Sequence, residues 1–159
     1  MTDVAVAAGV GAEAPRPTLW TIGYEQATQD AVLGALREAE VELLADVRQL
    51  PLSRRPGFSK SALRAGAEAV GIAYRHYRAL GTPPDGRAAA KRGNDAELAR
   101  IYAGQLELPE AIAAAAELRS LAQEQRVALL CYERAPEHCH RRLLAEAMFA
   151  DFDVEDLTP

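Results

Sequence analysis

Short apolar runs alternate with segments of helical periodicity along almost the whole chain, and this alternation constrains the fold more than any other feature. The runs are rich in β-branched and aliphatic residues, as strands are, and they cover residues 19–24, 41–47, 72–77, 126–131 and 152–157. Strands that alternate with helices pair in parallel and are joined by right-handed crossovers. We therefore predict an α/β fold, a three-layer sandwich in which helices cover both faces of a mainly parallel sheet of about five strands.

Caps and apolar faces mark the helices between these strands. Thr28 and Ser59 are suitable N-caps for helices after the first and second strands. Further helices are expected at residues 95–103, from Pro109 onwards and at residues 137–149. The buried face of the helix that begins at Pro109 is expected to contain Ile112, Ala115, Leu118, Leu121 and Ala122. Residues 81–94 combine turn formers and basic residues without apolar periodicity, so we expect a long loop or lid there.

Length and composition indicate one globular domain. The 159 residues can bury a full core, and 49% hydrophobic with 26% charged residues is ordinary for a folded protein. Residues 1–17 contain acidic residues and no solid apolar stretch, so we expect a disordered tail ahead of a single domain at residues 18–159. No apolar run reaches the ~18–20 residues of a membrane span, and a membrane partner is not expected. Two cysteines are too few for a disulfide scaffold, which favours a reducing, cytoplasmic location.

Charge is distributed unevenly along the chain. Residues 48–92 contain ten basic and two acidic residues, a net charge of +8, whereas the remainder has eight basic and 21 acidic residues, a net charge of −13. Such a division favours an anionic small molecule or a nucleic acid as the partner of one face. The alternative is that these basic residues lie scattered on the surface and pair with acidic residues elsewhere.

The unusual polar residues follow the ends of the predicted strands. In an open parallel sheet, ligands bind outside the carboxyl ends of the strands, where helix N-termini also point. We therefore expect a binding pocket at that edge of the sheet. The residues that the sequence places there are Tyr24, Asp46, Arg48, His76, Tyr77, Cys131, Glu133, Cys139, His140 and Arg141.

Several of these residues belong to longer motifs that resemble a known family. The chain is similar to the uncharacterised domain-of-unknown-function 488 family over about residues 18–157, and the pattern C-x-E-x-x-P-x-x-C-H-R at residues 131–141 is its most specific part. The other matching segments are residues 21–24, 45–48, 51–60, 74–76 with 80–81, and 129–133. The resemblance implies a bacterial, cytoplasmic α/β domain, and it implies no particular reaction.

Cys139 is the candidate nucleophile of this motif. A helix N-terminus and the flanking His140 and Arg141 would stabilise its thiolate, and exposed backbone N–H groups there would bind an oxyanion. Asp46 or Glu133 would then transfer protons. The alternative is that Cys139 is only a small buried hydrophobic residue. His76 is either an acid–base group or a hydrogen-bonded residue at the end of its strand.

The segment at residues 54–60 is the strongest anion-binding signal in the sequence. Arg54 and Arg55 offer forked donors, Pro56 and Gly57 favour a turn, and Lys60 opens the following helix. Arg48 is a further candidate for binding a phosphate. Tyr24 and Phe58 are candidates for stacking on a base, or they close the core. The chain lacks a Walker or G-x-G-x-x-G pattern, so an ordinary NTPase or dinucleotide enzyme is not supported.

Three functional hypotheses follow from these residues. The first is a small enzyme that acts on a phosphate-bearing or nucleotide-like substrate, and the second is a non-catalytic nucleic-acid-binding module. The third is a metal-binding protein whose ligands are Cys131, either Cys139 or His140, and His76. The first two hypotheses involve no metal ligand. The sequence specifies no cofactor and no oligomeric state.

Overall fold

Five parallel strands form the central layer of the described chain, as predicted. The computed structural model describes residues 15–159, so the predicted tail at residues 1–17 lies almost entirely outside the described residues. The strand order is β4-β3-β5-β2-β6, and every pair of neighbours is parallel. The strands are β2 (Thr18–Gly23), β3 (Leu43–Asp46), β4 (Ala73–His76), β5 (Val127–Cys131) and β6 (Asp153–Leu157).

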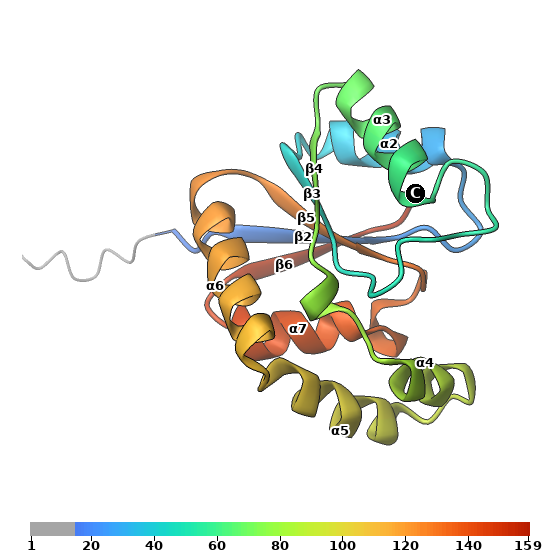
Figure 1. Cartoon of the computed structure of the whole chain (residues 1–159). Helices are drawn as coiled ribbons and strands as arrows, with labels where there is room; N and C mark the ends of the chain where they lie inside the picture. The colour runs from blue at the N-terminus through green and yellow to red at the C-terminus, as the bar shows by residue number, and fades with distance from the viewer. Residues whose placement is uncertain (1–14) are drawn as a thin grey trace, which may run out of the picture.

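Helices cover both faces of the sheet, which confirms the three-layer α/β fold (Figure 1). The helices α2 (Gln29–Glu38) and α3 (Lys60–Ala69) lie on one face. The helices α6 (Pro109–Glu124) and α7 (His140–Met148) lie on the other face, with α4 (Pro84–Lys91) and α5 (Asp95–Leu106) beyond α7. Alternate strand residues face the two helical layers, so each face has its own buried apolar cluster.

Both predicted N-cap residues, Thr28 and Ser59, lie at the start of a helix. The side chain of Thr28 accepts a hydrogen bond from the backbone N–H of Ala31 at 3.1 Å and caps α2. Ser59 stands at the N-cap of α3 but its hydroxyl bonds to the backbone of Ser53 instead. In α6 the prediction for Ile112 is wrong, because its side chain is 53% exposed while Ala111 takes the buried position.

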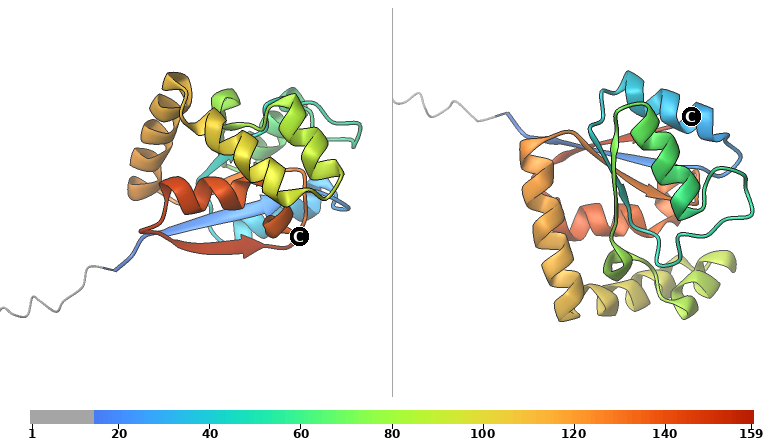
Figure 2. Two further views of the ribbon diagram at one scale, coloured as in Figure 1. Left: turned by 90° about the horizontal axis from the view of Figure 1, so that it is seen from below. Right: turned by 45° about the horizontal axis from the view of Figure 1, so that its top comes forward.

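The prediction of a loop or lid at residues 81–94 is wrong, because α4 occupies most of this segment. Pro84 lies in the first turn of the helix, where proline is tolerated, and three alanines follow it. The buried residues of α4 are Gly86 and Ala89, and a Cβ atom on Gly86 would lie 2.5 Å from Thr82 Cγ2. The helix packs against α5 (Figure 2). Because its buried residues are small, the segment lacks the regularly spaced large apolar side chains that indicate a helix in a sequence.

Chain connectivity creates a crevice at the carboxyl edge of the sheet. The chain leaves β2 and β3 towards α2 and α3 on one face, whereas it leaves β5 towards α7 on the opposite face. Since β5 lies between β3 and β2, the connections diverge on both sides of it. Such switch points are where open α/β sheets bind ligands. Within residues 15–159, no helix is long and apolar enough to cross a membrane.

Candidate functional site

A cavity of about 320 Å³ lies at this crevice, and we call it the strand-end cavity. Its lining residues come from the ends of β2 and β5, from the loop after β3, from α4 and the residues just before it, from α5, and from the start of α7 and the segment before it. Those residues are Tyr24, Arg48, Gln49, Leu50, Leu52, Ser53, Thr82, Arg87, Ala90, Lys91, Leu98, Cys131, Tyr132, Glu133, His138 and His140. Predicted site residues Tyr24, Arg48, Glu133 and His140 are thus brought together.

Asp46 and Arg48 form a buried ion pair beneath the cavity. Asp46 is fully buried at the end of β3, and both of its carboxylate oxygens accept hydrogen bonds from the Arg48 guanidinium, at 2.8 and 2.7 Å. Tyr74 donates a further hydrogen bond to the same carboxylate. Burial opposes the charge on Arg48, but the hydrogen bonds and the charge of Asp46 outweigh it and raise the pKa of Arg48. Both oxygens of Asp46 are therefore occupied in holding Arg48 in place.

The guanidinium of Arg48 is also bonded on its other side. Its Nη1 donates to the Phe58 carbonyl at 2.7 Å and to the Tyr24 hydroxyl at 3.1 Å. Tyr24 stacks on Phe58 with ring centroids 4.4 Å apart, and its ring meets the edge of Tyr132 at 5.4 Å. Phe58 is fully buried, so its ring closes the core, and the aromatic surface that the cavity offers comes from Tyr24 and Tyr132.

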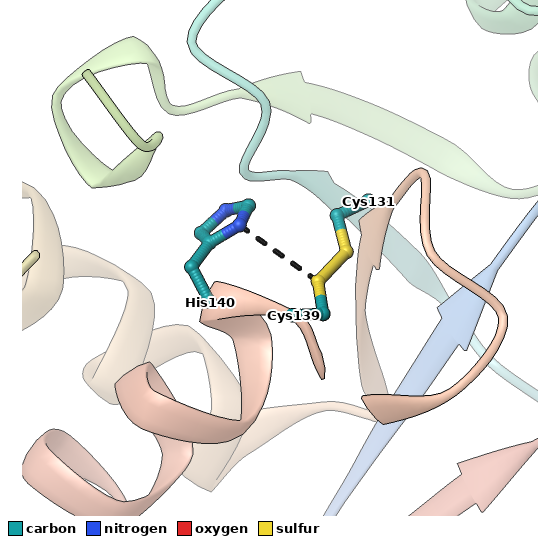
Figure 3. A group of neighbouring side chains, drawn as sticks. All are labelled: Cys131, Cys139 and His140. Carbon is teal, nitrogen blue, oxygen red and sulfur yellow. Dashed lines mark hydrogen bonds between the residues drawn. A yellow bond between two sulfur atoms is a disulfide. The ribbon is translucent and has the colours of Figure 1, made fainter. Parts of the chain in front are cut away.

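Two cysteines and a histidine meet at the floor of the strand-end cavity (Figure 3). Cys131 ends β5, Cys139 is the N-cap of α7, and their sulfur atoms are joined as a disulfide. Cys139 is buried and does not line the cavity, whereas Cys131 and His140 do. A nucleophilic role for Cys139 therefore needs the reduced form of this pair. The chain connectivity brings the two cysteines together, because the turn after β5 returns the chain to the start of α7.

His140 has a defined orientation in this group. Its Nε2 lies 2.6 Å from the Val47 carbonyl oxygen, and its Nδ1 lies 3.8 Å from Cys139 Sγ. A carbonyl oxygen only accepts, so Nε2 carries the proton and Nδ1 presents its lone pair to the sulfurs. Burial lowers the pKa of His140 to about 4, which is consistent with a neutral ring.

Arg141 is a structural residue rather than a ligand-facing one. Its guanidinium is fully buried and donates to the backbone carbonyls of Glu133 at 2.7 Å and Arg134 at 3.0 Å. The same Nη1 lies 3.4 Å from Cys131 Sγ. Burial lowers the pKa of Arg141 and raises the pKa of the nearby Glu133 carboxyl group, whose side chain reaches the cavity.

The segment at residues 54–60 does not contribute side chains to the strand-end cavity. Arg54 and Lys60 are exposed, and Arg55 donates a hydrogen bond to the Ala27 carbonyl. His76 lies outside the cavity as well, with Nε2 2.7 Å from the Arg48 carbonyl oxygen. Of the basic residues in the +8 segment, Arg48, Arg64 and Arg75 form ion pairs with acidic residues.

The positive charge beside the cavity comes instead from α4. Arg87 lies on this helix and uses Nη1 for its hydrogen bonds to Gln49 and to the Thr82 carbonyl, and Lys91 lies one turn further along. Both residues line the cavity, and both were missed as site residues because residues 81–94 were expected to be a loop. The sequence did contain a signal for the pair, because the two residues are four positions apart and residues at i and i+4 share a helix face.

The fold and the cavity together define an open, parallel α/β domain with a cavity at its topological switch point. Within that class, the chain belongs to the family described as domain of unknown function DUF488, whose family model matches residues 28–148. This match confirms the resemblance carried by the motifs between Asp46 and Arg141, while the motif at residues 21–24 lies outside the matched range. No curated protein and no solved structure matches the chain.

Proposed function

We propose that the strand-end cavity binds a small anionic molecule that carries a phosphate or a similar group, and that the protein is a small enzyme acting on it. The observation that carries the proposal is the cavity itself, about 320 Å³ in volume and bordered by Arg87 and Lys91. This volume falls within the range of small-ligand pockets, about 300–1,000 Å³. A concave site of this size favours a small molecule over a polynucleotide.

The cationic wall suits the anionic part of such a ligand. Arg87 is anchored through Nη1 by Gln49 and Thr82, which leaves its Nε and Nη2 donors for a ligand. A pre-positioned guanidinium binds phosphate oxygens through paired hydrogen bonds, and Lys91 adds a mobile point charge. The rings of Tyr24 and Tyr132 line the same cavity and can contact a flat or apolar part of the ligand.

The enzymatic part of the proposal depends on the groups at the floor of the cavity. Glu133 is the carboxylate available for proton transfer, because Asp46 is occupied by Arg48. Burial raises the pKa of this carboxyl group above its ordinary value, which favours the protonated form that a general acid requires. Cys131 and His140 lie beside it, with Cys139 behind them. Thiol chemistry at this floor requires a reducing compartment, so we propose the cytoplasm as the location.

Thermal unfolding of the full chain against phosphate, sulfate, nucleotides and a short oligonucleotide tests this proposal. A ligand present at about 100 times its dissociation constant adds about 2.7 kcal/mol to the free energy of unfolding. At this chain length the expected rise in Tm is roughly 5–10 °C. Replacing both Arg87 and Lys91 by alanine is expected to abolish the rise, because each lost charged hydrogen bond costs about 1.5–3 kcal/mol.

The matched control is the double variant Arg54→Ala with Lys60→Ala, which also removes two positive charges but from exposed positions outside the cavity. It is expected to keep the full rise in Tm. If the control loses the response and the Arg87/Lys91 variant keeps it, the binding site is the loop and not the strand-end cavity. A response to the oligonucleotide alone would favour the nucleic-acid-binding module instead.

A further inference from the structure

Three side chains at or directly behind the cavity floor bring sulfur and nitrogen ligand atoms close to one point. The sulfurs of Cys131 and Cys139 and a ring nitrogen of His140 all lie within 4.8 Å of one another, and all three residues are buried. We propose that, when the cysteines are reduced, these residues bind a zinc ion whose remaining coordination position faces the strand-end cavity. The proposal goes beyond the anionic ligand, since metal binding is measured without it.

The orientation of His140 is that of a metal ligand. Its Nε2–H donates to the Val47 carbonyl at 2.6 Å, so the lone pair on Nδ1 is directed towards Cys139 Sγ (Figure 3). Histidines that bind metals almost always donate their second ring N–H to a carbonyl, carboxylate or water, which sets the tautomer and the ring plane. The Val47 carbonyl supplies this contact for His140.

The spacing of the donors also suits zinc. A zinc ion at about 2.3 Å from sulfur and about 2.1 Å from nitrogen in tetrahedral geometry separates its donors by roughly 3.5–3.8 Å. The distance from Cys139 Sγ to His140 Nδ1 is 3.8 Å. The Cα atoms of the two cysteines are 7.5 Å apart, wider than the about 4.4–6.8 Å that disulfides usually span, so their side chains can separate around an ion.

One positive charge, that of Arg141, and one carboxyl group, that of Glu133, lie beside the sulfurs. Arg141 is fully buried with Nη1 3.4 Å from Cys131 Sγ, and its Nε has no hydrogen-bond partner in the described chain. Two thiolates bring a charge of −2 into a buried site, which one arginine cannot balance alone. A zinc ion supplies the remaining positive charge. Binding follows reduction of the disulfide by an external phosphine or dithiol to two thiols, whose two protons leave as Zn²⁺ binds.

The site has three protein ligands, which is the number found in catalytic rather than structural zinc sites. Cys131 and His140 line the cavity, so a water molecule or an anionic ligand in the cavity can occupy the fourth position. Glu133 lines the same cavity with Oε1 3.7 Å from Cys131 Sγ, which makes its carboxylate the candidate to accept a proton from such a water molecule. The arrangement therefore gives the cavity floor a Lewis acid and a neighbouring base.

Titration of the full chain with Zn²⁺ and Co²⁺ tests the proposal. The protein is reduced with a phosphine, stripped with a chelator and freed of both before titration. We expect one Zn²⁺ per chain, and with Co²⁺ the visible bands of a tetrahedral ion together with sulfur-to-cobalt charge transfer. Cys131→Ser, Cys139→Ser and His140→Gln are expected to weaken Zn²⁺ binding by more than the about 10–100-fold that loss of an outer-shell partner costs.

His76→Gln is the matched control, because His76 lies outside the strand-end cavity and its Nε2 contacts the Arg48 carbonyl oxygen rather than the sulfurs. It is expected to retain one Zn²⁺ per chain and the cobalt spectrum. If a variant fails to fold, the wild-type chain still tests the proposal, because bound Zn²⁺ should protect both cysteines from alkylation. The proposal would be overturned if the folded, reduced wild-type protein bound no Zn²⁺. It would also be overturned if the Cys139→Ser variant bound Zn²⁺ as tightly as the wild type, and the cysteine pair would then be only a disulfide.

Discussion

Replacing Asp46 by asparagine is expected to lower the free energy of unfolding by about 3–5 kcal/mol, because removing one member of a buried ion pair leaves the other charge uncompensated. Asp46 is 0% exposed and Arg48 is 6% exposed, so little water can replace the lost carboxylate. The substitution keeps the size of the side chain but removes its charge, so the effect reports on electrostatics rather than on packing. Urea unfolding of the reduced protein measures it.

Asp151→Asn is the matched control for this measurement. Asp151 pairs with Arg119 on the surface, with side-chain exposures of 56% and 34%. Exposed pairs of this kind contribute about 0–1 kcal/mol. If Asp46→Asn also costs less than about 1 kcal/mol, the strand-end cavity admits enough water to solvate Arg48, and Arg48 then becomes available to a ligand.

Gly23→Ala is expected to cost at least about 3 kcal/mol, at or above the top of the range for overpacking a folded protein. An added Cβ atom would lie 2.5 Å from Arg141 Nη1 and closer still to the Glu133 carbonyl oxygen. Neither neighbour can move freely, because Arg141 is fully buried and donates to that same carbonyl. The backbone must therefore separate where β2 and β5 end, and thermal and urea unfolding measure the loss.

Gly34→Ala is the control, and it is expected to raise the free energy of unfolding rather than lower it. Gly34 lies in the interior of α2, is exposed, and has no atom within 4 Å of an added Cβ. Alanine stabilises such a helical position by roughly 0.5–1 kcal/mol relative to glycine. A neutral result for Gly23→Ala would mean that the turn after β5 does not press against β2 in solution, and the close approach at the cavity floor would then be absent.

Secondary structure with strong periodicity was predictable from the sequence. The five apolar runs became the five strands with boundaries shifted by one or two residues, since a continuous aliphatic run such as β5 has few alternatives to a buried parallel strand. Thr28 capped its helix because the capping contact is local. The helix α4 was not predicted for the opposite reason: its buried residues are a glycine and an alanine, which give no apolar period.

The candidate site was only partly predictable. The sequence placed Tyr24, Glu133 and His140 at the carboxyl edge, because strand ends of a parallel sheet meet there. It could not show that Asp46 neutralises Arg48, since that depends on the side-chain directions at the end of β3. Arg54 and Arg55 carried the strongest local signal and yet lie outside the cavity, because a turn motif does not specify the direction in which its side chains point.

By itself, then, the sequence determined the parallel α/β fold, the edge of the sheet where polar side chains gather, and the presence of two cysteines and a histidine near one another in that motif. These features follow from periodicity and chain order, which are local properties. Only the tertiary structure decided that α4 supplies the charge at the cavity and that His140, rather than His76, meets the sulfurs. Those outcomes depend on packing between residues distant in the chain, where competing contacts of similar energy are separated only by the complete fold.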